Sequence, residues 1–172
     1  MNLEIITDKI KLKIVEKADA ESLFKLRTDP EVSQFVNRDL NKTLADIEEF
    51  IEHKINHQHE ILFFTIKTIP ENELAGTICL WNIDHEKKYA EVGYELFPHF
   101  QGRGIMSDAL KAILKLAFNE LGFEYLQAFT NKQNLSSRKI LEKFGFEHLV
   151  NKKDENNVNN VIYGLNSINH LK

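Results

Sequence analysis

The alternation of hydrophobic and polar residues divides the chain into short helices and strands. Residues 9–15 (KIKLKIV) alternate polar and apolar, which predicts a half-buried strand. Residues 18–28 carry apolar side chains at helical spacing and stop before Pro30, so a helix is predicted there. A second helix is predicted over residues 43–56, where Thr43 is a good N-cap and an apolar stripe follows.

The middle and the end of the chain mix strands with two further helices. Residues 61–69, 74–83 and 89–97 are rich in β-branched and aromatic side chains and are separated by polar turns, which predicts a meander. A long amphipathic helix is predicted over residues 104–121, a strand over 124–129, and a helix over 134–144 that ends at Gly145. Residues 146–150 and 161–165 predict a final hairpin around an Asn-rich loop.

This order of elements predicts an α+β fold with a mixed central sheet of about six to seven strands flanked by helices. The regular strand–helix alternation of a doubly wound fold is absent. The 172 residues contain no repeat and no low-complexity linker, so one domain over residues 1–172 is expected.

Composition and charge narrow the classes of protein. No stretch approaches the ~18 uncharged apolar residues of a membrane helix, and the N-terminus does not resemble a signal peptide, so a soluble cytoplasmic protein without a membrane partner is expected. The net charge of -4 gives no support to nucleic-acid binding. Acidic side chains predominate over residues 29–60 and basic ones over 99–143, which suits a cationic and an anionic ligand. From the charge counts alone, ordinary solvated helix faces are the better explanation of both runs. The oligomeric state stays open, a homodimer included.

Cysteine and histidine offer little chemistry. A single cysteine excludes an intrachain disulfide, and Cys79 lies in an apolar run typical of a small buried residue rather than a nucleophile. His53 and His57 are one helical turn apart, a spacing that can hold a metal. Their polar surroundings and the missing H-E-x-x-H pattern favour a solvated helix face, so no metal is predicted.

Two segments carry candidate chemistry. In FPHFQGRGIMSDAL (residues 97–110) a strand ends, a glycine-bearing loop follows and a long helix begins. The free N–H groups and the positive dipole end of such a helix bind phosphate, glycines allow close approach of the ligand, and Gln101 and Arg103 add donors. A plain turn is the alternative, and the Gly-Lys-Ser/Thr ending of a Walker loop is absent. In NLSSRKILEKFGF (residues 134–146), Asn134 is a good N-cap and Ser137 lies in the first turn.

Together, AEVGYELFPHFQGRGIMSDAL and the later N-x-x-S-x-K-I-L-E-K-F-G-F closely resemble the GNAT superfamily of acetyltransferases. The branch most like this chain is that of the ribosomal-protein alanine N-acetyltransferases. The match is good over residues 91–146, and the opening K-L-x-I-V-x-x-A-D-A also resembles that branch. The resemblance implies the GNAT fold, acetyl-CoA as acyl donor, no metal, and direct attack of a primary amine on the thioester in a ternary complex.

The resemblance also implies a binding site for the donor. The backbone of the loop would hold the CoA pyrophosphate, and its residues are Gln101, Gly102, Arg103, Gly104, Ile105, Met106 and Ser107. Met106 occupies a position that is usually small in the family, although its N–H can still donate. Leu96 and Phe97 would pair with the pantetheine arm, and Asn134 and Ser137 would flank the arm and the thioester.

The catalytic roles are less completely matched. Glu91 is the first candidate for a general base, because the branch usually has Glu before the Gly-Tyr pair, and Glu95 is the second. Many relatives carry a tyrosine acid in the last helix, where this chain has Leu141. Ser137 is therefore the expected hydrogen-bond donor to the leaving thiolate. Tyr94 is a weaker candidate that alternation places on the face opposite Glu91.

The acceptor is the least determined feature. The resemblance favours a protein N-terminal amine, whereas the acidic run also suits a polyamine or an aminoglycoside. A non-catalytic acyl-CoA-binding regulator and an interaction domain with a relic loop are the alternatives outside the enzymes.

Overall fold

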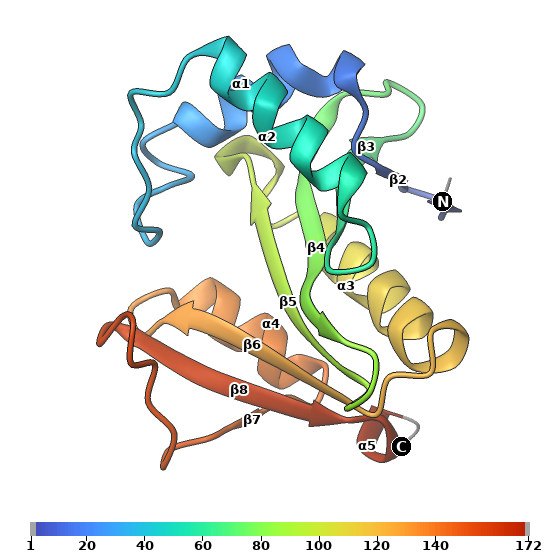
Figure 1. Cartoon of the computed structure of the whole chain (residues 1–172), viewed down its shortest axis with the longest axis vertical. Coiled ribbons are helices and arrows are strands. Elements are labelled where there is room, and N and C mark those ends of the chain that lie inside the picture. The colour runs from blue at the N-terminus through green and yellow to red at the C-terminus, as the bar shows by residue number, and fades with distance from the viewer. Residues whose placement is uncertain (1–2, 171–172) are drawn as a thin grey trace.

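One continuous mixed sheet organises the computed structural model, which describes residues 3–170 (Figure 1). The strands are β1 (Glu4–Ile6), β2 (Ile10–Ile14), β3 (Leu62–Thr68), β4 (Leu74–Asp84), β5 (Tyr89–Leu96), β6 (Tyr125–Asn131), β7 (Glu147–His148) and β8 (Asn160–Asn166). Their order across the sheet is β1-β2-β3-β4-β5-β6-β8-β7. The α+β class and the mixed sheet with flanking helices are confirmed.

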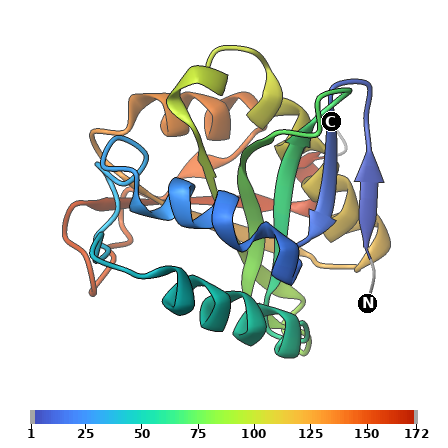
Figure 2. The ribbon, with the colours of Figure 1, turned by 90° about the horizontal axis from the view of Figure 1, so that it is seen from above.

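Two layers of helices cover the sheet (Figure 2). The helices α1 (Ala20–Thr28) and α2 (Leu44–Asn56) pack on one face, around buried residues such as Leu23 and Ile51. The helices α3 (Ile105–Lys115) and α4 (Leu135–Lys143) belong to the larger core on the other face, which includes Ile113 and Leu141. Short turns are η1 (Lys17–Asp19), η2 (Pro98–Phe100), η3 (Leu116–Glu120) and α5 (Ser167–His170).

Helix boundaries follow the local signals in the sequence. The Thr43 side chain accepts a hydrogen bond from the Asp46 N–H and caps α2, as predicted. Gly145 has a φ of 86° and ends α4 in the predicted left-handed conformation. The long helix predicted over residues 104–121 is α3 followed by a π-helical turn at its end.

The predicted count of six to seven strands was wrong, because the sheet has eight. The missed strand is β1, a three-residue edge strand that pairs with β2 and is too short to show a period in the sequence. The predicted hairpin near the C-terminus forms, but its first strand is only two residues long.

The sheet opens where its only parallel pair begins to separate. The strands β5 and β6 pair at Tyr89–Tyr125, Ala90–Leu126 and Glu91–Gln127, and then diverge (Figure 1). The Phe97 N–H donates to the Ala75 oxygen on β4 at 2.9 Å, so odd-numbered residues of β5 bond to β4. The backbone groups of Val92, Tyr94 and Leu96 therefore face the opening, which places free hydrogen-bonding groups along one of its walls.

Among the described residues, no helix combines the length and the apolar character needed to cross a bilayer. Nor does any group of three or more metal-binding side chains gather within that part of the chain. His53 and His57 stack with their ring centroids 4.1 Å apart. Burial raises the pKa of the Cys79 thiol to about 12, so this side chain is no nucleophile at neutral pH.

Candidate active site

Two cavities lie in the opening between β5 and β6. Cavity 1 has a volume of about 370 Å³ and is lined by residues of the α1–α2 loop, β5, the loop before α3 and the first turns of α4. Cavity 2 has a volume of about 250 Å³ and is lined by the α1–α2 loop, β4, β5, β6, α4 with its N-cap, the β7–β8 loop and the start of β8. Both cavities are lined by Phe35, Val36, Tyr94, Asn134 and Ser137. The two cavities therefore meet between β5 and the first turn of α4.

One end of cavity 1 is the glycine loop before α3. Gly102 and Gly104 have φ values of 72° and 76°, a conformation that favours glycine. Within the described chain, the backbone N–H groups of residues 104–107 donate to no other residue, as expected for the first turn of a helix. The N-cap residue Gly104 has no side chain to bond them. These N–H groups are available to a ligand.

Three basic side chains surround this loop. A Cβ atom on Gly104 would lie 3.2 Å from Lys9 Nζ, so the ammonium group of Lys9 lies beside the loop. Lys143 Nζ donates to Ser107 Oγ at 3.3 Å from the end of α4. The Arg103 guanidinium lies 5.2 Å from the centre of the Phe100 ring. Free N–H groups, a helix dipole and positive side chains together make an anion-binding site.

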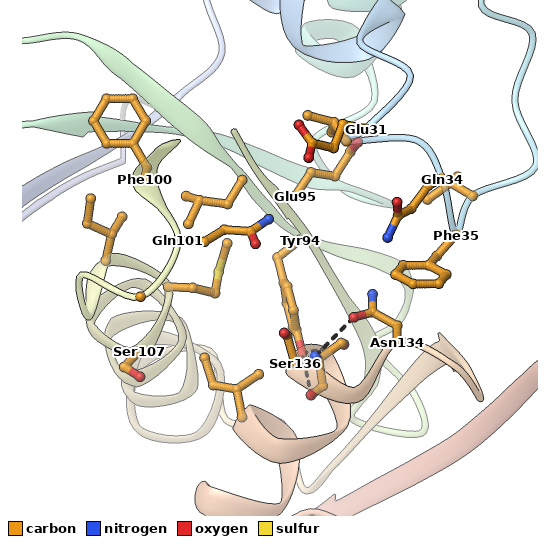
Figure 3. A pocket seen from close by; sticks show the side chains of 18 of the residues that line it. Glu31, Gln34, Phe35, Tyr94, Glu95, Phe100, Gln101, Ser107, Asn134 and Ser136 are labelled. Carbon is orange, nitrogen blue, oxygen red and sulfur yellow. Dashed lines mark hydrogen bonds between the residues drawn. The ribbon is translucent and has the colours of Figure 1, made fainter. Parts of the chain in front are cut away.

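Tyr94 marks the junction of the two cavities. Its side chain extends from β5 toward the first turn of α4, where its hydroxyl lies 3.0 Å from Ser137 Oγ and 3.3 Å from the Ser137 carbonyl oxygen (Figure 3). The Ser137 N–H in turn donates to Asn134 Oδ1 at 3.2 Å. Burial raises the pKa of the Tyr94 hydroxyl above its ordinary value, so the group keeps its proton at neutral pH. The junction thus holds two neutral hydroxyl groups.

Glu95 lines cavity 1 and anchors the α1–α2 loop. Its Oε2 atom lies 2.7 Å from Arg38 Nη2, and its Oε1 atom lies 3.5 Å from Arg27 Nη1. All three side chains are at most 21% exposed. Burial and the neighbouring Arg38 lower the pKa of Arg27, because two cations share one carboxylate. The loop beyond α1, which supplies walls of both cavities, is therefore tied to β5 through Glu95.

Glu91 occupies a different place. It is 6% exposed and lines neither cavity. Its Oε1 atom accepts hydrogen bonds from Asn82 Nδ2 at 2.8 Å and from the Tyr89 hydroxyl at 3.1 Å. The register between β4 and β5 is regular from Trp81–Glu91 to Gly76–Leu96, so Glu91 and Glu95 share one face of the sheet, as alternation predicts.

Most residues of the predicted site come together at cavity 1. The cavity is lined by Glu95, Leu96, Gln101, Gly102, Gly104, Ile105, Met106, Ser107, Asn134 and Ser137. Arg103 and Phe97 line neither cavity. The Phe97 N–H bonds to β4 and its carbonyl oxygen accepts from the Phe100 N–H, so both of its backbone groups have partners.

Sequence reasoning missed several residues around the cavities. The α1–α2 loop contributes Phe35 and Val36, the β7–β8 loop contributes Asn157, and the first residue of β8 is Asn160. Lys9 reaches the glycine loop from the start of β2. None of these residues belongs to a motif, and the chain separates them widely from the segments that they meet.

The order of the strands and the helices on both faces of the sheet define the class of fold as that of the GNAT domain. Residues 9–147 match the family described as "Acetyltransferase (GNAT) domain", and the chain belongs to this family. The N-acetyltransferase p20 of Bacillus licheniformis, described as uncharacterized, is 26% identical over 145 residues, which are 83% of this chain and 82% of the relative.

Two solved structures show how widely the fold is shared. RimL, described as a ribosomal L7/L12 alpha-N-protein acetyltransferase in complex with coenzyme A, superposes with a TM-score of 0.82 at 17% identity, covering 94% of this chain and 96% of RimL. The spermidine N-acetyltransferase of Vibrio cholerae, in complex with CoA and spermine, superposes with a TM-score of 0.81 at 18% identity, covering 96% of this chain and all (100%) of that one. The predicted superfamily is confirmed, and a ribosomal-protein acetyltransferase is among the proteins that share the fold.

Proposed function

We propose that this protein is an acetyl-CoA-dependent N-acetyltransferase that acts on a primary amine, with a protein N-terminal amine as the first candidate. The observation that carries the proposal is the pair of cavities that meet at Tyr94 and Ser137, one of which ends at an anion-binding helix terminus. Such an arrangement suits two substrates that react at the meeting point.

Acetyl-CoA fits cavity 1. The free N–H groups of residues 104–107, with Lys9 and Lys143 beside them, suit the pyrophosphate of the donor. The unpaired edge of β5 at Tyr94 and Leu96 suits the amide groups of the pantetheine arm. The thioester then belongs near Asn134 and Ser137, where the first turn of α4 closes the cavity.

The reaction forms one bond and breaks one. The amine nitrogen attacks the carbonyl carbon of the thioester, the carbon–sulfur bond breaks, and the electron pair leaves with sulfur. The attacking amine loses a proton to a base or to water, and the thiolate gains one. An α-amine with a pKa of about 8 costs roughly 1 kcal/mol to deprotonate at pH 7, whereas a lysine-like amine costs about 4–5 kcal/mol.

Tyr94 and Ser137 are the proposed donors to the leaving thiolate or to the carbonyl oxygen. Both hydroxyls lie at the junction, and the raised pKa of Tyr94 keeps its proton in place. Many relatives carry a tyrosine acid at the position of Leu141 in α4. We propose that Tyr94 supplies the missing hydroxyl from β5. The base stays an inference from the resemblance, which ranks Glu91 above Glu95, although only Glu95 lines a cavity.

A polyamine acceptor is the second candidate. Glu31 and Glu95 lie on one side of cavity 1, opposite Asn134 and Ser136 (Figure 3), and a carboxylate attracts an ammonium group. A spermidine N-acetyltransferase shares the fold, which supports this second candidate.

Calorimetry with acetyl-CoA measures whether the protein binds the proposed donor. Release of the CoA thiol measures transfer of the acetyl group to an amine. At 100 times its dissociation constant, acetyl-CoA should stabilise the fold by about 2.7 kcal/mol. Release of CoA should then depend on an added amine, with N-terminal peptides and spermidine as the two main arms. No binding at millimolar acetyl-CoA would sink the proposal, and binding without turnover on any amine would indicate a non-catalytic acyl-CoA-binding protein.

A further inference from the structure

Cavity 2 differs from cavity 1 in that no charged side chain of the described residues lines it. The residues that line it include the aromatic Phe35, Trp81 and Phe129 and several asparagines. Its one ionisable group is the Tyr94 phenol, whose pKa burial raises. A polycation would therefore find no counter-charge among the residues that line this cavity.

Three of these asparagines hold their side-chain amides in the same way, with the oxygen bonded to a backbone N–H. Asn131 Oδ1 accepts from the Gln133 N–H at 2.9 Å, Asn134 Oδ1 from the Ser137 N–H at 3.2 Å, and Asn157 Oδ1 from the Asn159 N–H at 3.0 Å. The backbone thus fixes each oxygen, while the three Nδ2 groups donate to no other described residue. All three residues are half-buried. Three residues that line cavity 2 accordingly each have an amide donor available to an acceptor oxygen.

A fourth asparagine has the opposite orientation. Asn160 Nδ2 donates to Asp154 Oδ2 at 2.9 Å, which leaves its Oδ1 atom free to accept. A matching ligand has several carbonyl oxygens and at least one N–H group and carries no charge beyond its amine. An extended peptide backbone has this pattern, whereas a polyamine offers N–H donors only.

We infer that cavity 2 binds the first residues of an extended, uncharged peptide N-terminus, whose backbone carbonyls accept from Asn131, Asn134 and Asn157. The inference rests on the proposed acetyl transfer and specifies its acceptor. The aromatic rings of Trp81, Phe35 and Phe129 then contact small or apolar side chains of the peptide. A lysine or arginine that enters the cavity would be desolvated without a partner.

The chemistry of the amine agrees with this acceptor. No carboxylate lines cavity 2, so the amine must reach the thioester with a substantial neutral fraction. An α-amine with a pKa of about 8 is roughly one-tenth neutral at pH 7, whereas an amine with a pKa near 10.4 is neutral in only about one molecule in 2,500. A cavity without a base therefore suits an α-amine better than a polyamine.

Trp81 provides a binding signal that does not depend on turnover. It is the only tryptophan of the chain, lines cavity 2 and is 42% exposed. In the CoA-bound protein, an amidated neutral tetrapeptide such as Ser-Ala-Thr-Ala should shift or quench its emission. The N-acetylated form of the same peptide should do so as well, because recognition runs through the carbonyls. Lys-Lys-Thr-Ala and spermidine should bind at least tenfold more weakly.

Substitutions at Asn131 and Asn157 test the donors. Asn157→Asp and Asn131→Asp each keep the oxygen that accepts the backbone N–H but replace the amide donor by an acceptor. Each should raise the KM for the neutral peptide at least tenfold and leave the affinity for acetyl-CoA unchanged. Asn156→Asp is the matched control. It adds the same charge to the β7–β8 loop, next to Asn157 but outside cavity 2, and should leave KM unaltered.

The outcomes separate the inference from the proposed function. Acetylation of spermidine in preference to the neutral peptide, with KM values unmoved by the two aspartate substitutions, would overturn the inference and leave the transferase intact. Equal binding of the neutral and lysine-bearing peptides would overturn it too. A Trp81 response to the neutral peptide without acetylation of any amine would support the peptide site and overturn the proposed function.

Discussion

Cavity 1 and cavity 2 adjoin but are built from different chemical groups. Cavity 1 ends at backbone N–H groups that any residue except proline supplies, with Lys9 and Lys143 beside them. Cavity 2 is lined mainly by asparagines and aromatic residues that come from six separate segments. The first arrangement tolerates much sequence change, whereas each residue of the second contributes its own hydrogen bond or contact.

The difference explains why one ligand is easier to identify than the other. A helix terminus with left-handed glycines binds phosphate through its backbone, so it recognises a whole class of donors. Amide side chains recognise a particular pattern of acceptors, so they select one acceptor among many. The comparison teaches that the donor follows from the fold of the family and the acceptor from the residues of this chain.

The largest effect is expected at the ion pairs that support both cavities. Glu95→Gln should lower the free energy of unfolding by about 3 kcal/mol, because it leaves Arg27 and Arg38 buried beside each other without a counter-charge. Chemical denaturation measures this loss. Glu124→Gln is the matched control, since its pair with Lys88 is exposed and should contribute less than about 1 kcal/mol. Equal effects of the two substitutions would contradict the anchoring role of Glu95.

The next largest effect is expected on the affinity for acetyl-CoA, which depends on the glycine loop of cavity 1 and not on cavity 2. Gly104→Val should weaken acetyl-CoA binding about 100-fold, because it disturbs at least two charge-assisted N–H contacts worth about 1.5 kcal/mol each. Calorimetry gives the affinity. Gly122→Val is the control, because Gly122 has a similar φ of 71° but lies outside both cavities, so it adds comparable strain without touching the loop. Loss of affinity in both variants would show that strain alone is responsible.

A smaller effect is expected at the junction. Tyr94→Phe should lower kcat about 10- to 100-fold, with little change in acetyl-CoA affinity, because it removes a donor to the reacting group. The pKa of Tyr94 is raised above its ordinary value of about 10, so the wild-type hydroxyl stays protonated over the whole neutral range. The kcat of the wild type should therefore rise with pH as the amine loses its proton and show no fall below about pH 10. A fall between pH 7 and 9 would exclude Tyr94 as the donor.

Lys143→Gln should have a modest effect that is confined to the affinity for acetyl-CoA. Its ammonium group is at the surface beside Ser107, so its loss should weaken acetyl-CoA binding about threefold at low salt, and less at high salt. Affinity measured at two ionic strengths tests this expectation. Lys139→Gln removes a charge from the same helix outside both cavities and should change nothing.

The smallest effect is expected at Glu91. Its carboxylate is buried, bonds to Asn82 and Tyr89 and lines neither cavity, so Glu91→Gln should change kcat less than about threefold. The resemblance ranks this residue first as the base, and as the base it would lower turnover on substitution while acetyl-CoA binding stays near normal. Steady-state kinetics with the same amine decides between the two expectations.

Local signals in the sequence determined the elements and the donor site. Thr43 and Gly145 fix helix ends through their own hydrogen bonds and backbone conformation, and the glycine loop runs from a strand end into the first turn of α3. These features involve residues within a few positions of each other, so a linear pattern reveals them. The short strand β1 was not predicted, because three residues are too few to show the two-residue alternation of a strand.

Only the tertiary structure decided which side chains meet. Tyr94 and Ser137 are far apart in the chain, as are Glu95 and Arg38, and no pattern predicts that either pair is in contact. The six segments around cavity 2 come together because β5 and β6 separate after Glu91, and this divergence depends on the pairing of the whole sheet. The sequence therefore determined a helix terminus suited to a phosphate-bearing ligand, whereas long-range packing brought together the asparagines and aromatic residues of cavity 2.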